Sequence, residues 1–202
     1  LNDNMSTDST VKIALENGCE VVQFNTNNQM QDSRHLEIKN NCWKDAKTDW
    51  VLVCDLDELL DINEAQLKAE EKKGISMIWA ATYDMINLED NLDIAGMKYG
   101  TKGPEPGKFS LFNKKYISEM NYGPGAHSCN PIGTVAYSNK AYKLYHYWAI
   151  NENLAIKKYK IRRKRLSPEN LQMGWGTEIL FMTPKEIRKE YAQDCKQAVK
   201  IR

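Results

Sequence analysis

The chain has 202 residues, of which 28 are Lys or Arg and 27 are Asp or Glu, so its formal net charge is only +1. This near balance gives no overall field that would recruit nucleic acid or a membrane surface, and no stretch approaches the roughly 18 consecutive apolar residues of a membrane span. The length is sufficient for one domain with a substantial core. We therefore expect residues 1–202 to form a single domain with neither a nucleic-acid partner nor a membrane span.

The five cysteines are odd in number and form no CxxC pair. This usage argues against a disulfide framework and a zinc knuckle, and it indicates a reducing compartment, so we expect a cytoplasmic protein without a signal peptide. The chain begins at Leu1 without an initiator Met, in what looks like a strand-to-turn transition. We expect that this is not the natural N-terminus.

Strands and helices alternate along the first half of the chain, which is typical of right-handed βαβ units in a mostly parallel sheet. The predicted elements are a strand exit at 1–8, a helix at 9–18, a strand at 19–24, a helix at 33–46, a strand within 50–60, a helix ending at Gly74 and a strand at 75–85.

The second half begins with a Gly-, Pro- and Asp-rich segment, and a segment of that length is usually functional or disordered. The elements expected there are a long loop at 87–107, strands at 108–113 and 141–148 with a Gly-rich segment at 121–133 between them, a basic helix at 152–166 and a terminal amphipathic helix that starts at Pro184.

The most informative segment is WVLVCDLDELL, residues 50–60, in which five apolar residues lead directly into Asp55, Leu56, Asp57 and Glu58. Such a run is typical of a strand buried on both faces of a mainly parallel sheet, and ligands bind at the C-terminal edge of such sheets. Two carboxylates about 4 Å apart repel by roughly 4 kcal/mol at an effective dielectric near 20. A divalent cation that prefers oxygen ligands, Mn²⁺ or Mg²⁺, would relieve that repulsion.

A simpler interpretation is that one aspartate caps the following helix while the other acids are solvated. Asp61 is better placed to be that cap, because Glu64 follows it at capping-box spacing. The remaining acids then have no structural role, and this favours a metal or nucleotide site.

Two histidines could complete such a site. His146, at the end of a predicted strand, is the candidate third metal ligand beside Asp57, and His127, in the Gly-rich segment, is the alternative. A lone histidine is more often structural than a ligand, so a structural role stays open for both. His35, on the second predicted helix, is expected at the surface.

Three further residues could serve the same sheet edge. Asp3 lies in a turn where it could accept a hydrogen bond from a base imide or a ribose hydroxyl, although an ordinary Asx-rich turn is the alternative. The basic run at 157–165 would ordinarily be a solvated helix face or a nucleic-acid patch, but its closeness to His146 makes Lys157 or Lys158 a candidate phosphate contact.

The motifs together resemble those of family-2-like glycosyltransferases of the GT-A fold. NDNMSTDST is similar to a turn of that family, which places Asp3 on its base-contacting aspartate, and Lys39 stands where the family usually has an arginine. Asp55-Leu56-Asp57 resembles the DxD motif, and DLDEL resembles the DxDEF variant of a related branch.

The downstream pattern of that branch is matched by Lys108, His127 and His146, so the resemblance covers about residues 1–160. There are departures: the family's first strand and helix are absent before Leu1, and no Glu-Asp pair stands where many inverting members carry their base. Lysine in place of arginine at position 39 also weakens bidentate phosphate binding.

The resemblance implies an α/β fold with a GT-A-like open, mostly parallel sheet flanked by helices, and a single catalytic domain. It implies metal-dependent transfer of a sugar from a nucleotide-diphosphate donor, preferably a UDP-sugar, to a hydroxyl of a glycan or glycoprotein acceptor. Asp84, leaving the adjacent strand toward the same edge, is the candidate catalytic base. The alternatives are a nucleotidyltransferase and a catalytically inactive sugar-binding module of the same fold.

The expected ligands of Mn²⁺ or Mg²⁺ are Asp55, Asp57 and His146, with a ribose contact as the other possible role of Asp55. The expected donor-binding residues are Asp3, Lys39, Asp55, Leu56, Asp57 and Lys157.

Overall fold

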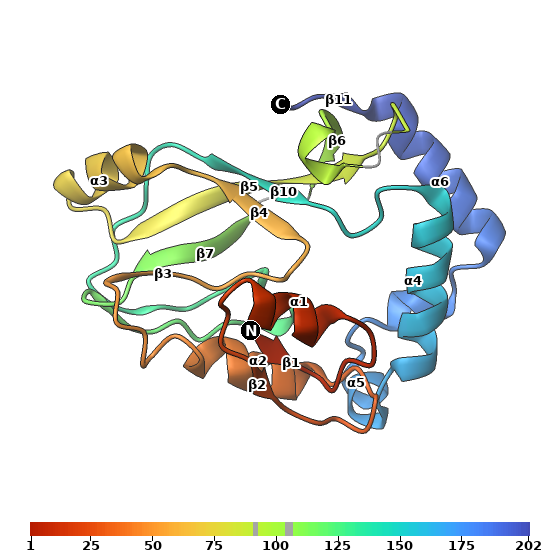
Figure 1. The fold of residues 1–202 in the computed structure, drawn as a ribbon, viewed down its shortest axis with the longest axis horizontal. Helices are drawn as coiled ribbons and strands as arrows, with labels where there is room; N and C mark the ends of the chain where they lie inside the picture. The colour runs from red at the N-terminus through yellow and green to blue at the C-terminus, as the bar shows by residue number, and fades with distance from the viewer. Residues whose placement is uncertain (91–92, 104–106) are drawn as a thin grey trace.

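The computed structural model describes residues 1–90, 93–103 and 107–202 (Figure 1). Within these ranges the chain forms one seven-stranded sheet, two two-stranded sheets and several helices. The expected mixed α/β class is therefore confirmed. Over the same ranges, no helix combines the length and the apolar character needed to cross a bilayer.

The large sheet is built around its longest strand, β5. Its members are β3 (Trp50–Leu52), β4 (Glu58–Asp61), β5 (Met77–Ile86), β6 (Tyr99–Lys102), β7 (Lys108–Asn113), β10 (Tyr142–His146) and β11 (Val199–Lys200). One edge of β5 pairs with β7 along its first half and with β6 along its second half, and the other edge pairs with β10. β3 pairs with β7, β4 with β10 and β11 with β6.

The expectation of a mostly parallel sheet is not met by these pairings. Only β5 and β10 run parallel, and the other pairings described for this sheet are antiparallel. Parallel neighbours need a long crossover, usually through an α-helix. In the described residues no α-helix lies between β5 and β6 or between β6 and β7, and these strands pair antiparallel accordingly.

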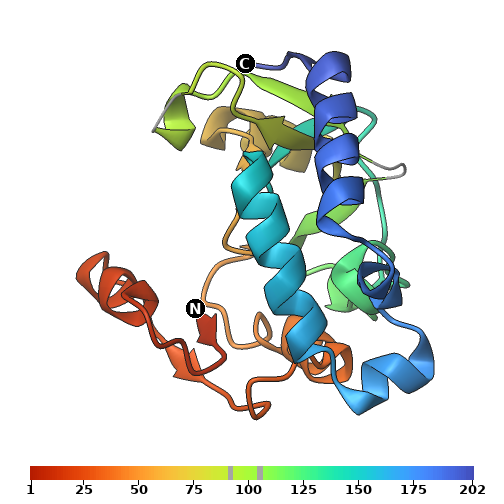
Figure 2. The same ribbon diagram turned by 90° about the vertical axis from the view of Figure 1, so that its right-hand side faces the viewer.

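The N-terminal segment forms the one predicted βαβ unit that the structure contains in its described residues. β1 (Asn2–Asp3) and β2 (Val22–Gln23) are parallel and are joined by α1 (Thr10–Glu16), as expected. They form a two-stranded sheet of their own rather than extending the large sheet, and Figure 2 shows this unit standing apart from it.

The other helices surround the large sheet, and α4 and α6 lie side by side along one end of it (Figure 2). The remaining elements are α2 (Asp32–Asn41), α3 (Glu64–Lys72), α4 (Glu152–Arg165), α5 (Pro168–Met173), α6 (Pro184–Gln197), the strands β8 (Ile117–Glu119) and β9 (Ile132–Gly133), and the 3-10 helices η1 (Ile94–Gly96), η2 (Pro124–Ala126) and η3 (Thr177–Leu180). Pro184 begins α6, as predicted, after a capping box formed by Thr183 and Glu186.

The predicted cap of α3 is wrong. Asn63, not Asp61, is the N-cap: its side chain accepts a hydrogen bond from Gln66 N, and the Gln66 side chain accepts one from Asn63 N, both at 2.9 Å. Asp61 is instead the last residue of β4, where its carboxylate accepts a hydrogen bond from the Tyr145 hydroxyl at 2.8 Å. The strand extends far enough to move the start of the helix by two residues.

The segment predicted as a long loop, 87–107, contains η1 and β6, and its residues 91–92 and 104–106 lie outside the described residues. Gly100 marks the close approach of β6 to β5, because a Cβ there would come within 2.8 Å of Asp84 O. A glycine inside a short strand is a known sign of such backbone contact.

Alternate residues of β5 and β7 divide the core between the two faces of the sheet. Met77 and Phe112 belong to the cluster that also contains Trp43, just after α2. Ile78 and Leu111 belong to the opposite cluster, against which α3 packs. A third cluster gathers where β5, β10 and the C-terminal strand meet.

Candidate functional site

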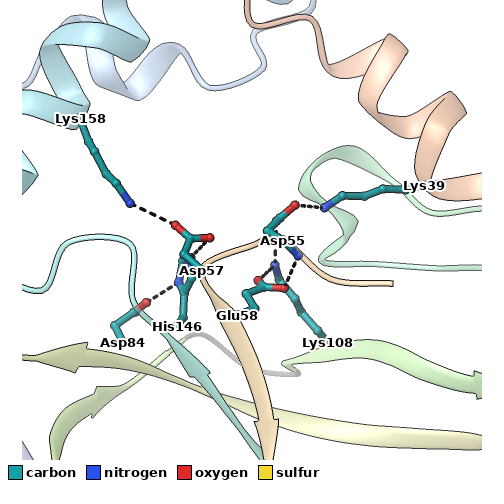
Figure 3. Close-up of polar contacts among 8 residues, drawn as sticks. All are labelled: Lys39, Asp55, Asp57, Glu58, Asp84, Lys108, His146 and Lys158. Atoms are coloured by element: carbon teal, nitrogen blue, oxygen red, sulfur yellow. Dashed lines mark hydrogen bonds and ion pairs between the residues drawn. The ribbon is translucent and has the colours of Figure 1, made fainter. Parts of the chain in front are cut away.

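The acidic motif occupies a turn between two strands. β3 ends at Leu52, β4 begins at Glu58, and residues 55–57 lie in the turn that joins them (Figure 3). Val51 and Val53 are buried, but Leu52 is 47% exposed. The prediction of a strand buried on both faces is therefore wrong: β3 is short, and only alternate residues face the core.

Asp55 is paired with a lysine from α2. Lys39 Nζ lies 2.8 Å from Asp55 Oδ1, and the next residue, Asn40, accepts a hydrogen bond from Tyr122 N at 2.8 Å, which fixes α2 against the Gly-rich segment. Burial opposes ionisation of Asp55, but Lys39 and then Lys108 outweigh it and hold the pKa of this carboxyl below its ordinary value.

A buried ion pair between Glu58 and Lys108 fixes the backbone of the turn. Glu58 and Lys108 have side chains that are 1% and 6% exposed, and Glu58 Oε1 is paired directly with Lys108 Nζ. The other oxygen, Glu58 Oε2, accepts a hydrogen bond from Asp55 N at 3.1 Å, and Lys108 Nζ lies 3.8 Å from Asp55 Oδ2. The conformation of the turn thus depends on a pair of charges that are almost completely removed from water.

Asp57 lies between a lysine and a histidine. Its Oδ2 atom is 3.1 Å from Lys158 Nζ on α4, and its Oδ1 atom is 3.9 Å from His146 Nε2 at the end of β10 (Figure 3). Tyr147 N donates a hydrogen bond to Asp57 O at 2.7 Å, which ties the turn to the strand that carries His146.

The sheet register explains why His146 meets Asp84. β10 lies between β4 and β5, and His146 is paired in register with Glu58 on one side and Asp84 on the other. Side chains in register on neighbouring strands point to the same face, and His146 Nδ1 lies 2.8 Å from Asp84 Oδ1. Asp84 is thus brought to the site, as expected, and it contacts the ring nitrogen opposite the one that faces Asp57.

A cavity of about 660 Å³ opens beside the acid turn. This volume lies within the range of roughly 300–1,000 Å³ that is typical of small-molecule sites. It extends from the N-terminal βαβ unit to the end of β3 and reaches α4, and Asp55, Lys39 and Leu56 line it. Leu56 is 77% exposed.

The described contacts of Asp3 are with its own turn and β2, and Lys157 is exposed. Asp3 is buried in its turn, where it accepts hydrogen bonds from Ser6 N at 3.1 Å and Gln23 Nε2 at 3.4 Å, and the bonds from Ser6 and Gln23 keep the pKa of Asp3 low. Its neighbour Asn4 lines the cavity. Lys157 is exposed on α4, and the next residue along the helix, Lys158, is the one that reaches Asp57.

His127 follows η2 in the Gly-rich segment. Gly125 has a positive φ of 68°, and a Cβ at that position would come within 2.6 Å of His127 Cδ2, so this turn requires glycine for both conformation and space. Partial burial of the ring, followed by the nearby Lys108 charge, lowers the pKa of His127.

Sequence reasoning missed three cavity-lining side chains. His35, expected at the surface, meets Phe24 edge to face with ring centroids 5.8 Å apart, and both rings line the cavity. Arg162 lines it from α4. A signal was present in the spacing, because His35 with Lys39 and Lys158 with Arg162 are i, i+4 pairs that share a helix face.

The described residues contain no group of three or more His, Cys, Asp or Glu side chains that could hold a metal ion. The three predicted metal ligands therefore do not form one group. Asp55 is paired with Lys39, while Asp57 and His146 face each other. Asp57 Oδ1 and His146 Nε2 are 3.9 Å apart, whereas adjacent ligands of an octahedral cation with bonds of about 2.1 Å are roughly 3 Å apart, so the two side chains would have to approach by about 1 Å to share one cation.

Comparison with protein-family models and with curated proteins finds no match for this chain.

The Lys39–Asp55 pair leads to a prediction about acid titration. Replacing Lys39 with Met should raise the pKa of Asp55, because the largest charge that favours its ionised form is removed. Since the folded-state pKa is the lower one, the stability that this pair contributes is present above the unfolded-state pKa and lost as the pH falls through the folded-state value. Carboxyl chemical shifts followed by NMR against pH measure this directly. Lys44→Met, which removes an ion pair with Glu119 elsewhere, is the control; an unshifted Asp55 titration in Lys39→Met would contradict the assignment.

The buried Lys108–Glu58 pair leads to a prediction about stability. Lys108→Met leaves Glu58 without its cation and should lower the free energy of unfolding by about 3–5 kcal/mol, as is usual when one partner of a buried pair is removed. Lys115→Met, which removes an exposed ion pair with Asp49, should cost less than about 1 kcal/mol. Urea unfolding curves of the two variants compare these values, and equal small losses would show that the buried pair does not stabilise the turn.

Proposed function

We propose that the protein is a metal-dependent glycosyltransferase of the GT-A type, which moves a sugar from a nucleotide-diphosphate donor, a UDP-sugar, to a hydroxyl of a glycan or glycoprotein. The single observation that supports this most is the position of the acid turn: Asp55 lines the large cavity, and Asp57 faces both His146 and a lysine. A nucleoside diphosphate needs charged side chains near its phosphates and an apolar surface for its nucleobase, and the cavity beside the acid turn is lined by both kinds of residue.

The donor is proposed to lie in the 660 Å³ cavity. Phe24 and His35 offer ring surfaces to a nucleotide base, and burial lowers the pKa of His35, which favours its neutral form there. Lys39 favours the ionised form of Asp55, and this carboxylate is proposed to accept a hydrogen bond from a ribose hydroxyl. Lys39 carries positive charge to the phosphate side of the same cavity.

Asp57 and His146 are the residues proposed to hold the divalent cation. Sites for Mg²⁺ commonly use one or two carboxylates and take their other ligands from substrate phosphates and water, so a third protein ligand is not required. A cation bound there supplies positive charge beside the diphosphate as that group departs. In the transfer itself the anomeric C–O bond breaks, its electron pair passes to the diphosphate, and the acceptor oxygen forms the new bond to the anomeric carbon.

Asp84 is the proposed base that takes the proton from the acceptor hydroxyl. It lines a second, smaller cavity of about 90 Å³, together with Trp148, Tyr159 and Tyr191. Aromatic side chains give flat apolar surfaces on which a sugar ring can lie.

Replacing Asp57 with Ala should abolish metal-dependent hydrolysis of the donor, with a loss of at least about 100-fold, because it removes both the cation ligand and the partner of Lys158. Release of UDP from a panel of UDP-sugars measures the reaction, and circular dichroism checks that the fold is intact. Asp45→Ala, at an exposed position just after α2, is the matched control. Retained turnover in Asp57→Ala would remove Asp57 from the mechanism.

A second experiment concerns the orientation of His146. Asp84 should hold the proton of the imidazole on Nδ1 and leave Nε2 free to bind a cation, as carboxylates that accept the other ring N–H of metal-bound histidines do. We expect Asp84→Ala to weaken Mn²⁺ binding by about 10- to 100-fold in calorimetry, and Asp84→Asn to weaken it less. The ¹⁵N shifts of the three histidines, assigned with His146→Gln, report the tautomer without metal. A proton on Nε2 in the parent protein would refute this orientation.

The two alternative functions predict different binding behaviour. A sugar-binding module would bind free sugar without metal and would not bind UDP more tightly when Mn²⁺ is present. A nucleotidyltransferase would release inorganic pyrophosphate from a nucleoside triphosphate and a sugar phosphate. Calorimetry with UDP, with and without Mn²⁺, combined with an assay for pyrophosphate release, separates these possibilities from sugar transfer.

A further inference from the structure

α4 carries two cations, Lys158 and Arg162, that lie near the ring of Trp148, a residue of the segment between β10 and α4. Lys158 Nζ lies 5.8 Å from the centre of the Trp148 ring, and the Arg162 guanidinium lies at the same distance from that ring. The two cations are four residues apart, so they lie on one face of the helix. Lys158 contacts Asp57, and Arg162 lines the large cavity, so this face spans from the acid turn to the cavity.

The rest of α4 is firmly anchored. Asn151 caps its first turn by accepting a hydrogen bond from Leu154 N at 2.9 Å, and α4 packs along α6. Arg163 donates hydrogen bonds to the carbonyl oxygens of Ile179 and Met182. These contacts fix the helix backbone. A change in the position of charge at this face therefore requires the side chain of Lys158 or Arg162 to move.

Lys158 stands at the carboxylate that the proposed function assigns to the divalent cation. Its side chain is 31% exposed and ends 3.1 Å from Asp57 Oδ2. A lysine ammonium is a compact charge on a flexible four-carbon chain, so it can leave one anion for another nearby without any change in the helix. When a doubly charged cation binds Asp57, the ammonium is repelled from it, and a diphosphate beside that cation is the strongest neighbouring anion.

We propose that Lys158 acts as an exchangeable internal cation: it neutralises Asp57 while the divalent cation is absent, and it moves to the donor diphosphate, beside Arg162, when the divalent cation binds. This inference rests on the proposed function for the identity of the diphosphate. It makes metal and nucleotide binding mutually dependent, since the metal must displace Lys158 and the diphosphate provides the place to which Lys158 moves.

The test uses two titrations of the whole chain by calorimetry, one with Mn²⁺ alone and one with UDP at saturating Mn²⁺. Lys158→Met should bind Mn²⁺ alone more tightly, by roughly fivefold or more, because the competing ammonium is gone. The same variant should bind UDP in the presence of Mn²⁺ more weakly, by about tenfold or more, because a charged hydrogen-bond donor to the diphosphate is lost. Loss of a positive charge alone would change both affinities in these same directions, so the comparison with Arg162→Met, which removes a charge from the same face of α4, distinguishes exchange from that simpler effect.

Arg162→Met separates the two roles. It should weaken UDP binding in the presence of Mn²⁺ by a similar factor and leave the affinity for Mn²⁺ alone unchanged, because Arg162 lines the cavity rather than pairing with Asp57. Lys160→Met, at an exposed position on another face of α4, is the control and should alter neither titration.

Unchanged or weaker Mn²⁺ affinity in Lys158→Met would overturn the exchange. An unchanged affinity for UDP in that variant would overturn its role at the diphosphate. If the parent protein binds Mn²⁺ but does not bind UDP, the proposed function fails while the Mn²⁺ titration still decides whether Lys158 and the metal compete. Absence of Mn²⁺ binding in the parent protein would overturn both.

Discussion

The buried pair of Glu58 and Lys108 is the interaction on which the rest of the site depends. It holds the short turn between β3 and β4 through a hydrogen bond from the backbone of Asp55, so the two neighbouring acids face outward in defined directions. A buried charge pair is weak evidence of added stability, but loss of one member is costly. The turn is thereby committed to one conformation, in which Asp55 faces α2 and Asp57 faces α4 and β10.

Each half-buried carboxylate of the motif meets a lysine that comes from a different helix. Lys39 reaches Asp55 from α2, and Lys158 reaches Asp57 from α4. The repulsion between neighbouring acids, which the sequence pattern predicts, is thus relieved by ammonium groups in this structure. The same groups are suited to an anionic ligand, so one set of charges can serve the ligand-free and the ligand-bound protein.

Local patterns predicted the starts of α1, α4 and α6 well and the sheet poorly, for identifiable reasons. A proline at a helix start and a glycine after a helix end act through the backbone within a few residues. α6 begins at Pro184 and α1 ends shortly before Gly18, as these residues predict. The pairing of β5 with β6 and β7 depends on segments far apart in the chain, and composition alone made the β6 region look like a loop. At the site, residue types pointed to Asp57, His146 and Asp84, but only the register of β4, β10 and β5 shows that the imidazole lies between the two acids.

The central claim is that Asp57 and His146 together receive a divalent cation that accompanies a nucleoside diphosphate. A crystal structure of the protein with Mn²⁺ and UDP, examined for the anomalous signal of manganese, tests this most directly. We expect one manganese peak bonded to Asp57 Oδ1 and His146 Nε2, with UDP in the adjacent cavity and Lys158 turned away from Asp57. Bound UDP without manganese at that position, and with Lys158 still on Asp57, would contradict it.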